Sequence, residues 1–326
     1  MSVFGYFGSK KRLAVELCSN LPPHNAWVEA FCGSAALTLA KSPAPIEIIN
    51  DLDKEIVNVF EQLRHNGKKL CRLIALTPYA REELQRARTP QSKISDLERA
   101  RRFLVSSMMA INGVFGEECG GFSYSDSYAR DGRDARVNRW YNLPDRICKA
   151  VERLRSVRVE NKDARELLKQ YLRRPATLVY LDPPYLADRT NGYTHDENNS
   201  KFHRELLKLA NRAHCMIFIS GYANDLYEKL LTKKRGWSRK TIKTTTRDSS
   251  GKIHKRTEVV WMNKHFQKAQ KENTIAITLN KTELKQKKLN PLRTKFIHKT
   301  RHHRHGKATR TNLASSGRAG KKYRRR

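Results

Sequence analysis

Four consecutive residues, Asp182-Pro183-Pro184-Tyr185, directly follow a short apolar run over residues 177–181. The run contains Leu, Val and Tyr and is typical of a buried β-strand. Consecutive prolines fix φ twice and remove two N–H donors, so they end a strand and cannot form the interior of a helix. We therefore expect a carboxylate, a rigid bend and an aromatic ring at the carboxyl end of a strand.

This combination suits an amino group on a flat heterocycle, such as N6 of adenine. The Asp182 carboxylate and the Pro183 carbonyl supply two acceptors, and the Tyr185 ring supplies a stacking face. Accepting both N–H groups favours a pyramidal nitrogen whose lone pair can attack an electrophilic methyl group. Such catalysis depends on positioning and preorganised electrostatics and requires no metal. The alternative is a Pro-Pro turn that only ends a strand.

A second pattern lies nearer the N-terminus, where small residues around Gly33 and Ser34 follow an apolar run over residues 26–31. Small side chains let backbone N–H groups and a helix N-terminus approach a ligand closely. Asp51 ends the next apolar run, where a carboxylate is well placed to accept ribose hydroxyls. The GxGxxG pattern is absent, which disfavours a nicotinamide site. The alternative is a tight strand–helix turn with a surface Asp.

The elements that position these residues alternate between strand and helix. Residues 26–40 and 45–64 each contain an apolar run followed by apolar residues at helical spacing, and this order returns after residue 156. Residues 237–246 and 257–263 flank a Ser-Gly turn, which predicts a hairpin. We therefore expect the α/β class, with a mostly parallel sheet that an antiparallel hairpin closes.

Residues 65–155 interrupt this alternation. They are helical in pattern at first and then rich in Gly, Ser, Asp and Arg, which predicts an insertion with its own helical core and a long loop. The catalytic domain is thus expected in two parts, 1–64 and 156–263. Residues 264–326 are too polar to bury a core and are expected to form a disordered basic tail.

The charge of the chain favours a polyanionic partner. It contains 66 Lys and Arg against 32 Asp and Glu, a net charge of +34, of which residues 264–326 contribute +18. Nucleic acid is the default partner for such an excess, and a solvated basic surface is the alternative. The six cysteines show no CxxC pair, and no apolar run reaches 18 residues. We expect a soluble, cytoplasmic protein without disulfides, structural zinc or a membrane partner.

Together these residues resemble the DNA N6-adenine methyltransferase family, in the class that places its target-recognition segment between the cofactor motif and Asp-Pro-Pro-Tyr. The resemblance covers residues 4 to about 263. The segments that carry it are YFGSKKRL (6–13), VEAFCGSAAL (28–37), NDLD (50–53), ENKDARELL (160–168), LDPPYL (181–186) and SSGKIHKRTEVVWMN (249–263).

The resemblance implies S-adenosylmethionine as the cofactor. The family's motifs imply contacts from Tyr6, Lys10, Phe31, Gly33, Ser34, Asp51, Asp163 and Asp182, and they imply catalysis by Asp182, Pro183, Pro184 and Tyr185. The chain departs from the family where Ala30 replaces Pro and where Ser34 and Ala35 replace part of a glycine run. All of these substitutes are small, so we still expect the cofactor to bind. An Asp rather than an Asn at the start of the catalytic motif favours a nucleobase over glutamine.

The resemblance also implies a Rossmann-like methyltransferase fold and a double-stranded DNA substrate. Because N6 lies inside the duplex stack, the adenine would have to be flipped into the site. Tyr193, in the polar segment after the catalytic motif, either closes over the flipped base or is an ordinary surface residue. We expect a site-specific, monomeric enzyme that requires no metal.

Target recognition is expected within residues 107–142. Arginines recur there every three residues among aromatic residues, at Arg130, Arg133, Arg136 and Arg139. Arginine reads guanine edges or holds phosphates, and the phosphate role is favoured for each one. Asn112 either pairs with an adenine edge or is a turn residue before Gly113.

Three alternatives remain at this point. An RNA adenine methyltransferase would share the same cofactor half. A non-catalytic nucleic-acid-binding protein could retain a methyltransferase frame, although the intact residues 182–185 argue against decay. A basic structural protein would need only residues 264–326.

Overall fold

The computed structural model describes Phe4 and residues 10–111, 120–125, 129–186, 200–247 and 253–275. Tyr6, Asn112, Tyr193 and the expected hairpin turn near 248–252 lie outside the described residues. The chain divides into two units, 1–277 and 278–326, and the following paragraphs concern the first.

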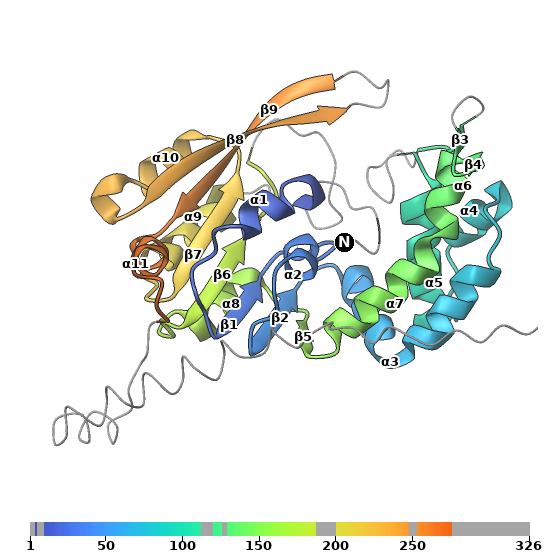
Figure 1. Ribbon diagram of the computed structural model, residues 1–326, viewed down its shortest axis with the longest axis horizontal. Coiled ribbons are helices and arrows are strands. Elements are labelled where there is room, and N and C mark those ends of the chain that lie inside the picture. The colour runs from blue at the N-terminus through green and yellow to red at the C-terminus, as the bar shows by residue number, and fades with distance from the viewer. Residues whose placement is uncertain are drawn as a thin grey trace, which may run out of the picture. The chain divides into compact units, whose positions relative to one another are not determined.

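A seven-stranded sheet lies at the centre of the α/β part of this unit (Figure 1). Its spatial order is β5-β2-β1-β6-β7-β9-β8. The first five strands pair in parallel, and β9 pairs antiparallel with both β7 and β8. The strands are β1 (Ala26–Glu29), β2 (Ile46–Asn50), β5 (Val157–Glu160), β6 (Thr177–Leu181), β7 (Met216–Gly221), β8 (Ser238–Arg247) and β9 (Ile253–Met262). The predicted fold class, a mostly parallel Rossmann-like sheet closed by an antiparallel hairpin, is confirmed.

Helices cover both faces of this sheet, which explains why its central strands are apolar throughout. Every residue of β6 and β7 is buried. Val179 and Ile217 pack on one face against α8 and α9, and Tyr180 and Phe218 pack on the other against α1, α2 and α11. These helices are α1 (Ala14–Cys18), α2 (Ala36–Ala40), α8 (Ala164–Tyr171), α9 (Ser200–Asn211), α10 (Asp225–Leu230) and α11 (Lys264–Glu272).

The helices between β2 and β5 build a second core around α3, which packs against α5 and α7 (Figure 1). Helix α3 runs through residue 65, where the sequence suggested a boundary, and bends at Asn66. A Cβ at Gly67 would lie 2.7 Å from Cγ2 of Val151, so this glycine allows α7 to approach α3 closely. The elements are α3 (Lys54–Leu76), α4 (Arg81–Arg88), α5 (Asp96–Met109), β3 (Ala129–Arg130), β4 (Arg133–Asp134), α6 (Ala135–Tyr141) and α7 (Leu143–Leu154).

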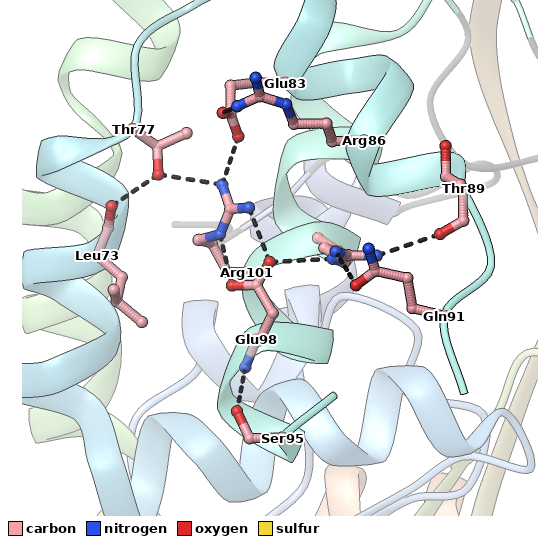
Figure 2. Close-up of polar contacts among 10 residues, drawn as sticks. Leu73, Thr77, Glu83, Arg86, Thr89, Gln91, Ser95, Glu98 and Arg101 are labelled. Carbon is pink, nitrogen blue, oxygen red and sulfur yellow. Dashed lines mark hydrogen bonds and ion pairs between the residues drawn. The ribbon is translucent and has the colours of Figure 1, made fainter. Parts of the chain in front are cut away.

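A network of charged side chains joins three of these helices (Figure 2). Arg101 on α5 donates to Glu98 on the same helix, to Glu83 on α4 and to the Thr77 hydroxyl after α3. These contacts raise the pKa of Arg101 and lower the pKa of Glu98. Ser95 caps the N-terminus of α5 by accepting from the Glu98 backbone N–H at 3.2 Å. The network holds α4 against α5 and the end of α3.

Helix α11 differs from the expectation that a tail begins at residue 264. Phe266 and Ala269 are buried against the sheet, and the Phe266 ring lies 5.6 Å from that of Phe218. The Asn263 side chain caps the helix by accepting from the Phe266 backbone N–H at 2.9 Å. Lysines and glutamines dominate the rest of the helix, so its short apolar stripe is not recognisable from the sequence pattern.

Two truncations should therefore behave differently. Ending the chain after Asn263 removes Phe266 from the core and is expected to cost about 3 kcal/mol or more in unfolding free energy. Ending it after Ile275 retains α11, so the Tm should stay close to that of the full chain. The longer of the two truncated chains should still lose affinity for the expected DNA substrate, most of all at low salt, because fewer cations release counterions. Thermal unfolding measures the first effect, and equal Tm values for the two truncations would contradict it.

Candidate active site

Three positions predicted from the sequence follow neighbouring strands at one edge of the sheet, and Tyr222, which was not predicted, lies at the same edge. The turn at Gly33 follows β1, Asp51 follows β2, Asp182 follows β6 and Tyr222 follows β7. Because β2, β1, β6 and β7 are parallel neighbours, their carboxyl ends meet at the same edge. The strand order reverses between β1 and β6, and the crevice outside such a reversal is where open α/β sheets bind ligands.

The Asp182 carboxylate is held by two donors. Lys10 Nζ lies 2.7 Å from Oδ1 and 2.9 Å from Oδ2. The Ser220 hydroxyl donates to Oδ1 at 2.8 Å and in turn accepts from the Tyr180 hydroxyl at 2.7 Å. Since Tyr180 and Ser220 are buried on adjacent strands, the orientation of the carboxylate is fixed from within the sheet.

Tyr185 is bound to the same cluster through its hydroxyl. It accepts from Lys10 Nζ at 2.5 Å and donates to Glu258 Oε1 on β9 at 2.9 Å. Its ring lies 4.4 Å from the ring of Tyr222, centroid to centroid. The prolines between Asp182 and Tyr185 carry no N–H, and within the described part of the chain no backbone N–H donates to the Pro183 carbonyl. That carbonyl fits its predicted role as a second acceptor.

The cluster contains one ammonium and two carboxylates. Burial alone would lower the pKa of Lys10, but Asp182, and to a smaller extent Tyr180 and Glu258, raise it above the ordinary value. Burial raises the pKa of Glu258, and the nearby Lys10 opposes that rise. Lys10 is therefore a cation at any physiological pH, and it is only 7% exposed.

The turn after β1 is tied to Asp51. The Gly33 backbone N–H donates to Asp51 Oδ2 at 2.8 Å, and the Asp53 backbone N–H donates to Oδ1 at 3.1 Å. Gly33 and Ala35 have φ of 46° and 50°, a left-handed conformation that is unfavourable for the alanine. Burial raises the pKa of Asp51 to about 6, against the effect of these backbone donors. Ser34 is buried beside them.

Two other described residues are expected to bind the cofactor, Phe31 directly before this turn and Asp163 at the start of α8. Asp163 caps α8 through the Arg165 N–H at 2.7 Å and also accepts from the Arg165 side chain, which lowers the pKa of Asp163. Phe31 is half-buried and meets the Phe202 ring edge-on, with centroids 6.3 Å apart. Asn161 donates to the Asp51 carbonyl at 2.8 Å, which joins the loop before α8 to the end of β2.

The arginines expected to recognise the target lie on β3, β4 and α6. Arg130, Arg133 and Arg136 are exposed, and Arg139 is half-buried, where burial lowers its pKa. The guanidinium of Arg133 stacks 4.1 Å from the centroid of Tyr141, a ring that is 61% exposed. The β3–β4 turn contains Asp131 and Gly132 with positive φ, as a tight hairpin requires.

The aromatic residues of this segment fall into two groups. Trp140 is buried and donates from Nε1 to the Thr77 carbonyl at 2.8 Å, so it belongs to the core of the helical insertion. Tyr124 and Tyr141 are exposed, and Arg81 on α4 lies 6.0 Å from the Tyr124 ring. Exposed rings beside guanidinium groups form a surface that suits nucleic acid.

Sequence patterns alone missed three residues that surround Asp182 and Tyr185. Ser220 lies near the end of β7 and Tyr222 follows that strand, and Glu258 is the one acid in the apolar run 257–262. Lys10 was expected only as a cofactor contact, yet its ammonium binds Asp182 and Tyr185. Within the described residues, no helix is long and apolar enough to span a bilayer, and no three His, Cys, Asp or Glu side chains are grouped to hold a metal.

Comparison with known proteins assigns the chain to a family. The sequence profile of the D12 class N6 adenine-specific DNA methyltransferases matches residues 6–245. The chain belongs to this family. This D12 class methyltransferase is 24% identical over 241 residues to the type II methyltransferase M1.LlaDCHI of Lactococcus lactis subsp. cremoris, a match that covers 68% of the chain and 81% of the relative.

Solved structures resemble the D12 class enzyme more distantly. A Pyrococcus horikoshii protein proposed to be an RNA methyltransferase aligns with a TM-score of 0.34 at 11% identity and covers 77% of both chains. A proposed methylase from Haemophilus influenzae aligns with a TM-score of 0.34 at 13% identity, over 80% of this chain and 91% of that one.

Proposed function

We propose that this enzyme transfers a methyl group from S-adenosylmethionine to N6 of an adenine that is flipped out of duplex DNA. The observation that supports this most is the position of Asp182 and Tyr185. They lie after a central parallel strand, beside the point where the strand order reverses, with their side chains fixed by hydrogen bonds. The family match supplies the adenine specificity and the DNA substrate.

The residues after β1 and β2 fit the proposed cofactor. The small residues Gly33, Ser34 and Ala35 leave room for a close approach to the backbone, and the half-buried Asp51 offers carboxylate lone pairs to ribose hydroxyls. Phe31, Asp163, Lys10 and Tyr6 would complete its surroundings. When bound, S-adenosylmethionine supplies an electrophilic methyl group on a sulfonium.

The residues after β6 would orient the target amino group. Asp182 and the Pro183 carbonyl accept hydrogen bonds from its two N–H groups. The rings of Tyr185 and Tyr222 restrict the orientation of the plane of the target base. Ser220 keeps Oδ1 of Asp182 in place through the transfer. N6 becomes positively charged as the methyl group bonds to it, and the Asp182 carboxylate stabilises that charge before the extra proton is lost to water.

The target must leave the base stack to reach this cluster, and Tyr193 is proposed to close over it. The exposed Arg130, Arg133 and Arg136 would hold DNA phosphates and set the register of the enzyme on the duplex. A net charge of +34 supports a polyanionic substrate in general. The charge alone fits DNA and RNA equally, and the family match supports DNA.

A methyl-transfer assay with labelled S-adenosylmethionine tests the proposal. Long unmethylated duplex DNA, total RNA and a protein mixture are offered in parallel, and we expect label in the DNA alone. Label in RNA with none in DNA would replace the proposal with an RNA adenine methyltransferase. DNA binding without transfer to any polymer would indicate a non-catalytic protein.

Arg133→Ala should weaken DNA binding without changing the fold. Loss of one phosphate contact is expected to lower affinity about five- to tenfold at low salt and to reduce the slope of log K against log salt by about 1. Fluorescence anisotropy with labelled duplexes at several salt concentrations measures both. Arg86→Ala is the matched control, because this residue is exposed and pairs only with Glu83 in the described structure. Equal affinities for wild type and Arg133→Ala would refute the contact.

A further inference from the structure

We propose that Glu258 is a positioning residue for methyl transfer, one that takes the Lys10 ammonium from Asp182 when Asp182 accepts the target amino group. The inference rests on the proposed function of the Asp182 site and adds a residue that neither the sequence motifs nor the comparisons assign. It concerns the charge on Asp182 at the moment of transfer.

Glu258 reaches the cluster from the closing hairpin. It lies on β9, one residue outside the part of the strand that pairs with β7, and it is 3% exposed. Its Oε1 accepts from the Tyr185 hydroxyl at 2.9 Å and lies 3.6 Å from Lys10 Nζ. Both distances join the middle of β9 to residues far away in the sequence.

In the structure the acceptor sites and the negative charge of Asp182 are largely taken up by other residues. Oδ1 already accepts from Ser220 and Lys10, and Oδ2 accepts from Lys10. A carboxylate oxygen offers about two acceptor sites, so Oδ1 has none left for a substrate N–H and Oδ2 has only one. The ammonium also neutralises the carboxylate, although transfer moves positive charge onto N6 and is favoured by a nearby negative charge.

Glu258 provides the ammonium with a second place to bind. The Tyr185 hydroxyl already connects the two, since it accepts from Lys10 and donates to Glu258. Moving Nζ by about 1 Å toward Oε1 would bring it to ordinary hydrogen-bond distance. The cluster of Lys10, Asp182 and Glu258 keeps a net charge of −1 throughout, but the uncompensated charge passes from Glu258 to Asp182.

A double-mutant cycle on the single-turnover transfer rate tests this exchange. Wild type, Glu258→Gln, Lys10→Met and the double variant are compared with saturating labelled S-adenosylmethionine and long unmethylated DNA. We expect Glu258→Gln to lower the rate about 10- to 100-fold, with DNA and cofactor affinities within about threefold of wild type. In the Lys10→Met background the same substitution should change the rate less than about threefold, because no ammonium is left to transfer.

Two further variants separate this role from packing. Glu258→Asp keeps the negative charge, and we expect it to recover most of the lost rate even if the Gln variant is less stable. Glu228→Gln removes a half-exposed carboxylate that pairs with Arg239 across the surface, and it should leave the rate unchanged.

The outcomes distinguish the two proposals. An active wild type with an equal loss from Glu258→Gln in both Lys10 backgrounds would overturn the role of Glu258 and leave the proposed function intact. A fully active Glu258→Gln variant would do the same. A wild type that transfers no label to DNA would overturn the proposed function, and the role of Glu258 would fail with it.

Discussion

Asp182→Ala is expected to lower methyl transfer by at least about 1,000-fold while cofactor affinity stays within about threefold of wild type. The substitution removes the acceptor for the target amino group and the negative charge that stabilises the cation forming on N6. It leaves the turn at Gly33 and its bond to Asp51 untouched. Single-turnover transfer and equilibrium binding of S-adenosylmethionine measure the two effects separately.

The fold of this variant needs its own control, because Lys10 loses its main partner. Glu258 and the Tyr185 hydroxyl still lie within reach of the ammonium, so we expect the variant to fold. Asp225→Ala, on the exposed first turn of α10, is the matched control and should keep full activity. A soluble Asp182→Ala protein with turnover near that of wild type would remove Asp182 from the mechanism.

Glu47→Ala is expected to have the largest effect on stability. The Glu47 side chain has no exposed surface, and its Oε1 lies 2.7 Å from Lys41 Nζ and 2.9 Å from Nη2 of Arg153. It thereby joins β2 of the sheet to α7 of the helical insertion. Removing the carboxylate leaves two largely buried cations facing each other, which should cost about 3–5 kcal/mol of unfolding free energy.

Chemical denaturation of Glu47→Ala and of Glu152→Ala measures this difference. Glu152 pairs with Arg155 on the surface of α7, with both side chains about three-quarters exposed, so its loss should be nearly neutral. Burial alone would raise the pKa of Glu47, but Arg153 and Lys41 lower it overall. The stabilisation is therefore present at neutral pH and is lost as the pH falls through that lowered pKa. Equal stabilities of the two variants would contradict the role of Glu47.

The sheet and the position of the catalytic motif were predictable because they depend on local patterns. Strands buried on both faces must be apolar throughout, and two prolines end a strand whatever surrounds them. The turn at Gly33 and the acid at Asp51 follow from the same alternation. The hydrogen bond that joins the Gly33 N–H to Asp51 was not predicted from the sequence.

The partners of these residues were not predictable, because they depend on how distant segments meet. Lys10 and Asp182 are 172 positions apart, and Tyr185 and Glu258 are 73 apart. Trp140 lies among arginines that suggest a surface, yet its ring completes the core of the insertion. Lysines and glutamine flank Phe266 in the sequence, so the segment is polar on average. Local hydrophobicity therefore places the end of the core before α11, although α11 belongs to it.

The most direct test is the identity of the methylated base. Long unmethylated duplex DNA is incubated with the enzyme and S-adenosylmethionine, digested to nucleosides and analysed by mass spectrometry. We expect N6-methyldeoxyadenosine from the wild type and none above background from Asp182→Ala. Methylation of cytosine, or N6-methyldeoxyadenosine formed equally by both proteins, would contradict the account of this site.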